Sequence, residues 1–493
     1  MQSEVGVRKH FYLIGICGTA MASLAGMLQS IGHRVTGSDV AAYPPMSDQL
    51  AAHGIDVLEP YDARNLATRP DVVVVGNAIS RGNVELEYVL DQRIPFCSMA
   101  AILHDEFLVG RESLVVAGTH GKTTTTSMLA WIYEVAACTD ARFAPSFLIG
   151  GVAENFGTSF RVRPIPPGET SPFLLEGDEY DTAFFDKGPK FLHYFPDAAI
   201  LTHVEFDHAD IYEDLTAVKT AFKRFVNLIP RRGRVVAFDG SENVTECVTH
   251  AFCAVERYGQ LEDSYWRVSE MRYEAQGMTW KLERGKEVFA ELALPMPGEH
   301  NAMNATAAAA LAAGQGVPVA AIVEALATFR SVKRRLEVRA EIGGVTIIDD
   351  FAHHPTAIRE TLRALRSAYP GRRLWAVVEP RSNTLRRNVF EEALVESLAL
   401  ADEVVLAGVF KSESLREGER LEPEMVVRKL REGGTSAQTY ADADAIVTAI
   451  APRLVSGDVI AILSNGAFGD IYHKLPEALL LTSPDDEASA LLR

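Results

Sequence analysis

Short apolar runs alternate with helix-like segments along most of this chain. Three such runs lie within the segments 71–75, 114–117 and 344–348, and each segment is typical of a strand buried in a parallel sheet. The segments between the runs carry apolar residues at helical spacing, and many runs end in glycine or polar residues. This alternation predicts an α/β fold built on doubly wound, mainly parallel sheets.

The chain has 493 residues, which is too long for one domain and predicts about three. We expect a Rossmann-like domain at 1–112, a central domain of the P-loop ATPase type with a mostly parallel sheet at 113–330, and a second Rossmann-like domain at 331–493. A proline-rich stretch at 159–172 is predicted to be a surface excursion of the central domain.

One segment of the central domain has the pattern of a phosphate-binding loop. The strand 114–117 leads into a glycine turn, and Lys122 opens a helical pattern that continues to about Ala137. Backbone N–H groups and the helix N-terminus would face an anion, and the Thr123 hydroxyl can bind Mg²⁺. A standard P-loop would have glycine where Val116 stands, so this loop is shorter. The alternative is an ordinary turn before a helix. The run of threonines at 123–126 favours the nucleotide site, because β-branched residues gain little there unless their hydroxyls are used.

Carboxylates follow the next apolar run of the central domain. After 173–175 the chain carries Glu176, Asp178, Glu179 and Asp181. In a chain with a phosphate loop, acidic groups at a strand end are the usual second anchor for Mg²⁺, and a solvated acidic turn is the alternative. Further along, His208 lies between Asp207 and Asp210 and is a candidate metal ligand or phosphate contact.

The first domain contains an incomplete dinucleotide fingerprint. Glycines would be needed at 15, 17 and 20, and the chain has Gly15, Cys17 and Ala20, with Gly18 out of step. The next strand ends at Asp39, about 20 residues after the turn. The pattern is weak support for NAD and better support for a phosphate-bearing ligand, with Asp39 near a sugar hydroxyl.

Polar residues also end strands elsewhere in the first and last domains. Asn77 and Ser80 follow the strand at 71–75 and are either ligand contacts or helix caps. In the last domain one strand ends in Asp349, Asp350, His353 and His354, and another delivers Arg381, Ser382 and Asn383. Several such strand ends favour one active-site wall over isolated structural pairs and surface charges. Asn301 and Asn304 share a helical face and could read a base edge or cap the helix.

Composition limits the partners and the compartment. The formal net charge of −18 argues against nucleic acid or an anionic membrane surface as partner. Five scattered cysteines have no metal-ligand spacing, which indicates a reducing compartment. The N-terminus has no apolar signal region, and no apolar run approaches ~18 residues, so we expect a soluble cytoplasmic protein. As a separate expectation, which these patterns do not determine, the protein is a monomer or weak homodimer.

Taken together, these motifs resemble the Mur ligase family over nearly the whole chain. They are GTHGKTT at 118–124, the acidic segment from Glu176, Asp207-His208, GEHNAMN at 298–304, RLE at 335–337 and DFAHHP at 350–355. The resemblance implies a UDP-sugar domain, an ATPase domain and a C-terminal domain for the amino substrate, with ATP and Mg²⁺ as cofactors. It further implies that an acyl phosphate forms on the sugar acid and is displaced by an amine.

The resemblance also implies a role for each candidate residue. The UDP-sugar set is Gly15, Cys17, Gly18, Thr19, Asp39, Asn77 and Ser80. The ATP set is Gly118, Thr119, His120, Gly121, Lys122, Thr123, Thr124, Asn304, Arg335 and Asp350. The metal ligands are Thr123, Glu176 and His208; the amino-substrate contacts are Arg381, Ser382 and Asn383; the catalytic residues are Lys122, His208 and His353. Many family members carbamoylate a lysine near the position of Lys219 or Lys223, and neither is assigned that role here.

Within the family, several segments favour one branch. They are GNAISRGN at 76–83, DEYDTAFFDK at 178–187, EFDHADI at 205–211, EPRSNT at 379–384 and SNGAFG at 464–469. This branch joins UDP-N-acetylmuramate to the tripeptide L-Ala-γ-D-Glu-meso-diaminopimelate in peptidoglycan recycling. The alternative is the branch that adds L-alanine, which typically has Asp-Glu-Ser-Asp where 178–181 stands. An NAD-dependent oxidoreductase and a non-catalytic UDP-sugar sensor are the more distant alternatives, disfavoured by the broken fingerprint and by the complete set of candidate contacts.

Overall fold

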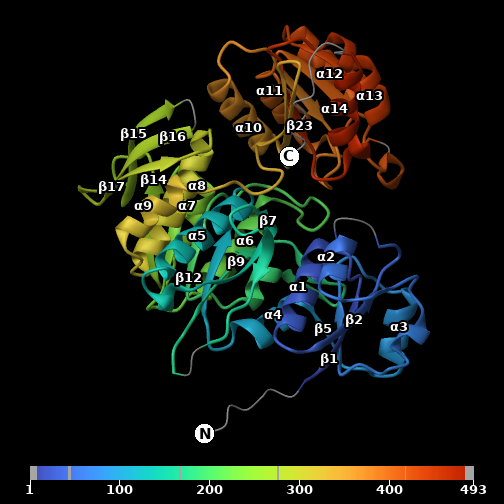
Figure 1. Cartoon of the computed structure of the whole chain (residues 1–493), viewed down its shortest axis with the longest axis vertical. Helices are drawn as coiled ribbons and strands as arrows, with labels where there is room; N and C mark the ends of the chain where they lie inside the picture. Colours follow the sequence, from blue (N-terminus) through green and yellow to red (C-terminus); the bar gives the residue numbers. More distant parts are fainter. Residues whose placement is uncertain (1–7, 43–45, 166–167, 275–276, 417, 483–493) are drawn as a thin grey trace. The chain divides into compact units, whose positions relative to one another are not determined.

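Parallel strands dominate the part of the chain that the computed structural model describes, which is residues 8–42, 46–165, 168–274, 277–416 and 418–482. The predicted α/β class is therefore confirmed (Figure 1). The chain separates into two compact units. The first consists of Met1–Glu205, Thr216–Arg267 and Thr306–Ala325, and the second of Phe206–Leu215, Val268–Ala305 and Leu326–Arg493. Each is described by itself below.

The N-terminal sheet of the first unit has the order β3-β2-β1-β4-β5, and all of its strand pairs are parallel. Its strands are β1 (His10–Ile14), β2 (Arg34–Ser38), β3 (Val57–Leu58), β4 (Val72–Val75) and β5 (Phe96–Ser98). The helices between them are α1 (Thr19–Ser30), α2 (Met46–Ala52), α3 (Val84–Asp91) and α4 (Met99–Leu103). Buried apolar residues fill β1 and β4, as expected for strands covered on both faces.

The second sheet of this unit carries the predicted phosphate loop. Within the unit its order is β14-β13-β12-β6-β9-β7-β8, parallel except at the β8 edge. The strands are β6 (Glu112–Ala117), β7 (Ser146–Ala153), β8 (Thr158–Arg161), β9 (Pro172–Gly177), β12 (Ala198–Leu201), β13 (Arg234–Phe238) and β14 (Ala254–Gly259). The helices include α5 (Lys122–Ala137), α6 (Leu215–Asn227) and α7 (Glu242–Val248), followed later by α8 (Glu299–Gly314) and α9 (Val319–Ala327).

The prediction of a surface excursion at 159–172 is wrong at its start. Residues 158–161 form β8, which pairs antiparallel with β7, and Phe160 is buried. A hairpin of β10 (Asp181–Ala183) and β11 (Asp186–Pro189) then follows the acidic segment and leads into the short helix η4 (Lys190–His193). At its tip, Phe184 packs against the N-terminal core cluster that contains Ile14, Val75 and Ile79.

The second unit contains a six-stranded sheet with the order β18-β19-β23-β20-β21-β22, parallel except for β18. The strands are β18 (Glu337–Ile342), β19 (Val345–Asp350), β20 (Leu374–Val378), β21 (Glu403–Ala407), β22 (Ser436–Tyr440) and β23 (Val459–Leu463). The helices are α10 (Pro355–Ala368), α11 (Glu391–Leu398), α12 (Pro423–Glu432), α13 (Ala443–Ile450) and α14 (Ile471–Thr482). Neighbouring residues of β19 enter different core clusters, Ile348 with α10 to α12 and Ile347 with α13 and α14, so helices cover both faces. The unit also contains most of β15 (Trp266–Glu274) and the antiparallel pair β16 (Gly277–Arg284) and β17 (Glu287–Leu294).

Candidate active site

The phosphate loop has the backbone geometry of an anion cradle. Gly118 has φ +136°, and a Cβ there would lie 2.1 Å from Thr202 Oγ1, so no side chain fits. Gly121 has φ 82° and begins α5 without a side-chain cap, whereas Asn83 caps α3. The first N–H groups of α5 are therefore uncapped by any side chain, and a phosphate at this helix end can take that place.

The loop lysine is held by a buried carboxylate. Lys122 Nζ donates to Gly118 O at 2.8 Å and to Glu179 Oε2 at 2.8 Å, and the Glu179 side chain is only 1% exposed. Burial alone would lower the pKa of Lys122, but Glu179 and Asp178 outweigh it and raise that pKa. The lysine is therefore charged at neutral pH.

Two of the predicted metal ligands lie side by side. Thr123 Oγ1 donates to Glu176 Oε2 at 3.0 Å, and the backbone N–H of Gly150 donates to the other Glu176 oxygen. Burial, with Asp178 nearby, raises the pKa of Glu176 to about 7. A hydroxyl and a carboxylate beside a phosphate loop are the oxygen ligands that Mg²⁺ prefers, so these residues fit the ion.

The rest of the loop is tied to the end of β12. Thr119 N–H donates to His203 O at 2.8 Å, and the His120 ring lies 3.0 Å from Glu205. Further along α5, Thr126 donates to Lys122 O at 2.8 Å. The threonine run thus serves two purposes, because Thr123 faces the acidic segment while Thr126 bonds to its own helix.

The predicted UDP-sugar residues gather at the carboxyl ends of β1, β2 and β4. Asp39 Oδ2 accepts from Cys17 N–H at 2.9 Å, and Tyr61 OH lies 3.3 Å from the other oxygen. Asn77 and Ser80 are exposed, and α3 is capped by Asn83, so the helix-cap interpretation of both residues is wrong. This arrangement leaves Asn77 and Ser80 accessible to a ligand.

In the second unit, Asp350 binds the segment that carries Arg335. Its carboxylate accepts from Leu336 N–H at 2.8 Å and from Ala352 N–H at 2.9 Å. The Arg335 guanidinium lies 5.0 Å from the Phe351 ring. Asp350 and Arg335 are thus held together at the carboxyl end of β19, where sheets of this type bind ligands.

Histidines surround Asp207 in the same unit. Burial would raise the pKa of Asp207, but His208, His353 and His354 outweigh it, and the pKa of this carboxylate lies well below its usual range. Thr384 Oγ1 also donates to Asp207 at 2.6 Å. His208 itself has φ 54°, a conformation that non-glycine residues rarely adopt and that clusters at functional sites.

The amino-substrate candidates lie beside this cluster. Arg381 stacks on Phe410 at 3.8 Å, Ser382 donates to His353 O at 3.2 Å, and Asn383 donates to Asp210 at 2.8 Å. A Cβ at Gly466 would lie 2.1 Å from Arg381 Nε, so glycine leaves room for this side chain. Asn304 is buried in α8, whereas Asn301 donates to Pro297 O at 2.7 Å and therefore stabilises the helix start.

The partners and burial of three lysines in the first unit could not be predicted from the sequence. Lys219 and Lys223 both bind Glu246, each at 2.6 Å. Lys190 is buried, lies 3.9 Å from Asp178, and has a pKa that burial lowers although Asp178 opposes the shift. In the sequence Lys190 is one more lysine after a glycine and a proline, and nothing there distinguishes it from a solvated one.

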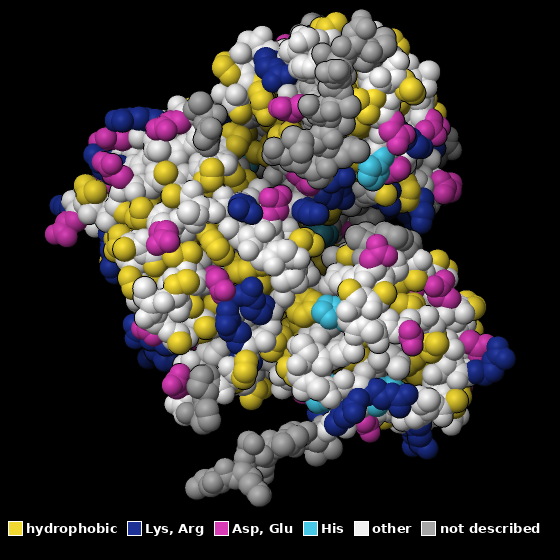
Figure 2. Space-filling view, in the orientation of Figure 1, with side chains coloured by type: hydrophobic (Ala, Val, Ile, Leu, Met, Phe, Trp, Pro, Cys, Tyr) yellow, Lys and Arg dark blue, Asp and Glu magenta, His cyan; other side chains and the backbone are white. Residues whose placement is uncertain are grey.

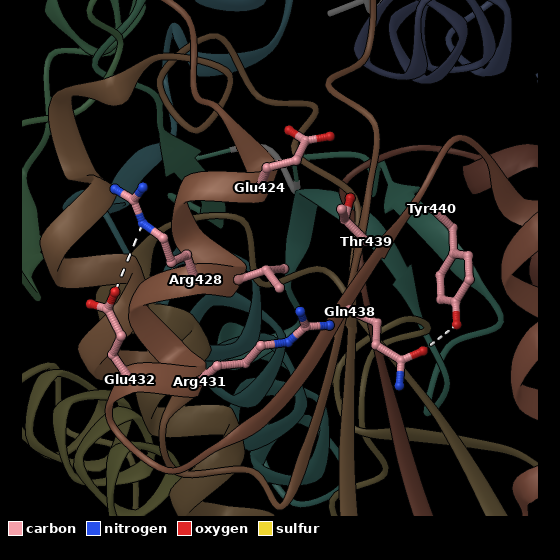
Figure 3. Close-up of a pocket in the computed structure, with 8 residues that line it drawn as sticks. Glu424, Arg428, Arg431, Glu432, Gln438, Thr439 and Tyr440 are labelled. Carbon is pink, nitrogen blue, oxygen red and sulfur yellow. Dashed lines mark hydrogen bonds and ion pairs between the residues drawn. The ribbon is translucent and has the colours of Figure 1, made fainter.

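Away from these residues, a hollow on the second unit lies between α12 and β22 (Figure 3). Two pairs of its lining side chains bind each other: Arg428 pairs with Glu432, and Tyr440 donates to Gln438. On the face shown in Figure 2, acidic and basic side chains are interspersed rather than gathered by sign. Among the described residues, no helix is both long and apolar enough to span a bilayer.

Three models of one protein family match successive parts of the chain. Residues 10–107 match "Mur ligase family, catalytic domain", 116–312 match "Mur ligase middle domain" and 334–466 match "Mur ligase, glutamate ligase domain". The chain is 40% identical over 473 residues to the UDP-N-acetylmuramate–L-alanyl-γ-D-glutamyl-meso-2,6-diaminoheptandioate ligase of Escherichia coli K12, covering 95% of this chain and 98% of that protein.

Two further relatives bear on the choice of branch. The UDP-N-acetylmuramate–L-alanine ligase of Polaromonas sp. JS666 is 32% identical, over 95% of this chain and 98% of its own length. The crystal structure of a murein peptide ligase from Psychrobacter arcticus 273-4 has a TM-score of 0.72 at 35% identity, covering 97% of this chain and 100% of that one. The sequence identity is thus greater toward the tripeptide-ligase relative, at 40%, than toward the L-alanine-ligase relative, at 32%.

Proposed function

This chain belongs to the Mur ligase family, whose members are ATP-dependent ligases that form a C–N bond, and we propose that it joins UDP-N-acetylmuramate to the tripeptide L-Ala-γ-D-Glu-meso-diaminopimelate. The observation that carries the proposal is the 40% identity to a ligase named for this acceptor, over 95% of the chain. We further propose that the chain serves peptidoglycan recycling in the cytoplasm, as a monomer or weak homodimer, with no nucleic acid or membrane as partner. We propose that its three functional domains are 1–112 for the UDP-sugar, 113–330 for ATP and 331–493 for the amino substrate.

The proposed reaction has two steps. First, an oxygen of the lactyl carboxylate attacks the γ-phosphate of ATP; an O–P bond forms, the bond to ADP breaks, and an acyl phosphate results. The tripeptide amine then attacks the acyl carbon, and the tetrahedral intermediate expels inorganic phosphate as the amine loses its proton. Phosphorylation is needed because a carboxylate has no good leaving group for direct attack by an amine.

The protein contributes positioning and charge neutralisation to both steps. Lys122 and the uncapped N-terminus of α5 support assignment of the triphosphate to this loop. We propose that Asn304, Arg335 and Asp350 bind the adenosine part of ATP. Thr123, Glu176 and His208 would hold Mg²⁺, which would neutralise phosphate charge when bound. His353 lies next to Ser382, which supports placing the acyl group and the incoming amine beside these two residues.

One assay tests the proposal against its nearest alternative. ADP release is measured with UDP-N-acetylmuramate and either the tripeptide or L-alanine at equal concentrations. We expect release to depend on both substrates, with kcat/KM at least about tenfold higher for the tripeptide. A preference for L-alanine would assign the chain to the other branch, and no release with either acceptor would refute the ligase reaction.

A further inference from the structure

Lys190 is a buried lysine that none of the roles above uses. It lies at the start of η4 with its side chain 6% exposed. Its ammonium lies 3.9 Å from Asp178 Oδ2 and 4.2 Å from the Tyr180 ring, and the carboxylates of Asp181 and Glu179 are near enough to act on its charge. Among the described residues, no acceptor lies within hydrogen-bonding distance of Lys190 Nζ.

A comparison with Lys122 shows how loosely this ammonium is held. Both lysines pair with the same acidic segment, but Lys122 lies 2.8 Å from Glu179, whereas Lys190 lies 3.9 Å from Asp178. Charge-assisted N–H···O bonds are about 2.7–2.9 Å long, so Lys122 makes one and Lys190 does not. A buried ammonium that lacks strong acceptors gains free energy when an anion binds it.

The surroundings of Lys190 indicate which anion the lysine would bind. The hairpin before it packs Phe184 against the core cluster that contains Ile79, in the N-terminal sheet where the sugar nucleotide is expected. The helix η4 itself packs against α4, which belongs to the same N-terminal part of the unit as that sheet. Lys190 also lies near enough to Lys122 to feel its charge. Lys190 therefore lies between the proposed UDP-sugar domain and the phosphate loop. This is where the lactyl carboxylate of the sugar nucleotide has to meet the γ-phosphate.

We propose that Lys190 binds the lactyl carboxylate of the sugar nucleotide and orients the oxygen that attacks ATP. This inference rests on the proposed function. Lys122 and the N-terminus of α5 already serve the phosphates, so a second cation on the sugar side complements the other reactant. In this role Lys190 recognises the feature that distinguishes a muramyl sugar from a plain N-acetylglucosamine.

Calorimetry with two sugar nucleotides tests the proposal without turnover. UDP-N-acetylglucosamine lacks the lactyl group, so the wild-type protein should bind UDP-N-acetylmuramate at least about tenfold more tightly. In Lys190→Met this ratio should fall to about 2 or less, with the affinity for UDP-N-acetylglucosamine unchanged. The matched control is Lys187→Met on the same hairpin, whose lysine is 69% exposed and pairs with Asp181; its ratio should equal that of the wild type.

Each outcome decides the question. A Lys190→Met protein that keeps the wild-type ratio overturns the inference and leaves the ligase function standing, whereas a wild-type protein that binds neither nucleotide refutes the proposed function itself. If Lys190→Met loses both ligands, Lys190→Arg decides: a restored ratio supports the carboxylate contact, and an unrestored one overturns it. In steady state, a rise confined to the KM for ATP would place Lys190 on the nucleotide and would also overturn it.

Discussion

Lys122 Nζ lies 2.8 Å from Glu179 Oε2, and the two residues are 57 positions apart in the chain. The lysine that we propose binds the phosphates of ATP is therefore already paired with a carboxylate that is almost fully buried. A phosphate that binds Lys122 has to compete with Glu179. Removing either member of the pair should also destabilise the fold, because the other charge is then left buried and uncompensated.

Glu179→Gln should separate these two effects. Without nucleotide the variant should be less stable than the wild type by about 1–3 kcal/mol, because a buried charged partner is lost. Its melting temperature should rise more than that of the wild type on addition of MgATP, because Lys122 no longer has to leave Glu179. Thermal melts with and without MgATP measure both. Asp181→Asn, which affects the exposed Lys187, is the control, and an ATP-induced rise no larger than in the wild type would contradict the competition.

Lys122→Ala should remove turnover and leave the sugar site alone. We expect kcat to fall about 10³-fold or more, because the charge that develops on the transferred phosphoryl group loses its main protein cation. The affinity for UDP-N-acetylmuramate should stay within about twofold. Coupled ADP assays and calorimetry check the two expectations, and retained activity would argue against the role of Lys122.

Gly466→Ala should act through Arg381. The added Cβ would lie 2.1 Å from Nε, so the guanidinium has to leave its place on Phe410. If Arg381 contacts the peptide, the KM for the tripeptide should rise about tenfold while the KM for ATP stays the same. Gly433→Ala is the control, because a Cβ there has 3.4 Å to its nearest atom. An unchanged KM for the tripeptide would remove Arg381 from the peptide site.

Asp349 should make stability depend on pH. Burial raises the pKa of Asp349 to about 6, although the Arg334 guanidinium lies 3.2 Å away and opposes the shift. The unfolded pKa is 3.8, so the folded protein binds this proton more tightly. Its contribution is fully present below about pH 4 and is lost as the pH rises through about 6, a change of about 3 kcal/mol. Between pH 4 and 7, Asp349→Asn should therefore gain stability relative to the wild type in denaturant unfolding. A pH-independent difference would contradict the raised pKa.

The phosphate loop and the acidic segment of the candidate site could be predicted from local sequence motifs. The turn at 118–121 and Thr123 could be predicted because strand, glycine turn and helix are contiguous in the chain. The acidic segment could be predicted because it directly follows the apolar run of β9, the strand that pairs with β6. The α/β class and the doubly wound sheets follow from the same short-range periodicity.

Long-range pairing explains what the sequence did not reveal. Which of four nearby carboxylates binds Lys122 depends on the register between β6 and β9, and Glu179 could not be chosen over Asp178 or Asp181. The cap of α3 proved to be Asn83 because the helix begins later than Asn77 and Ser80 suggested. The strand β8 was overlooked because it has four residues and prolines follow it closely. Lys190 could not be distinguished from other lysines in the sequence, because its burial depends on how the hairpin and α4 pack around it.

The fate of one oxygen atom tests the central claim most directly. The account requires that the lactyl carboxylate of the sugar nucleotide attack the γ-phosphate, so an oxygen of that carboxylate leaves with the phosphate when the amine arrives. The measurement uses UDP-N-acetylmuramate labelled with ¹⁸O in the carboxylate, unlabelled ATP and the tripeptide, and reads the released phosphate by ³¹P NMR. We predict one ¹⁸O atom in each phosphate; phosphate released without the label during amide formation would contradict the account.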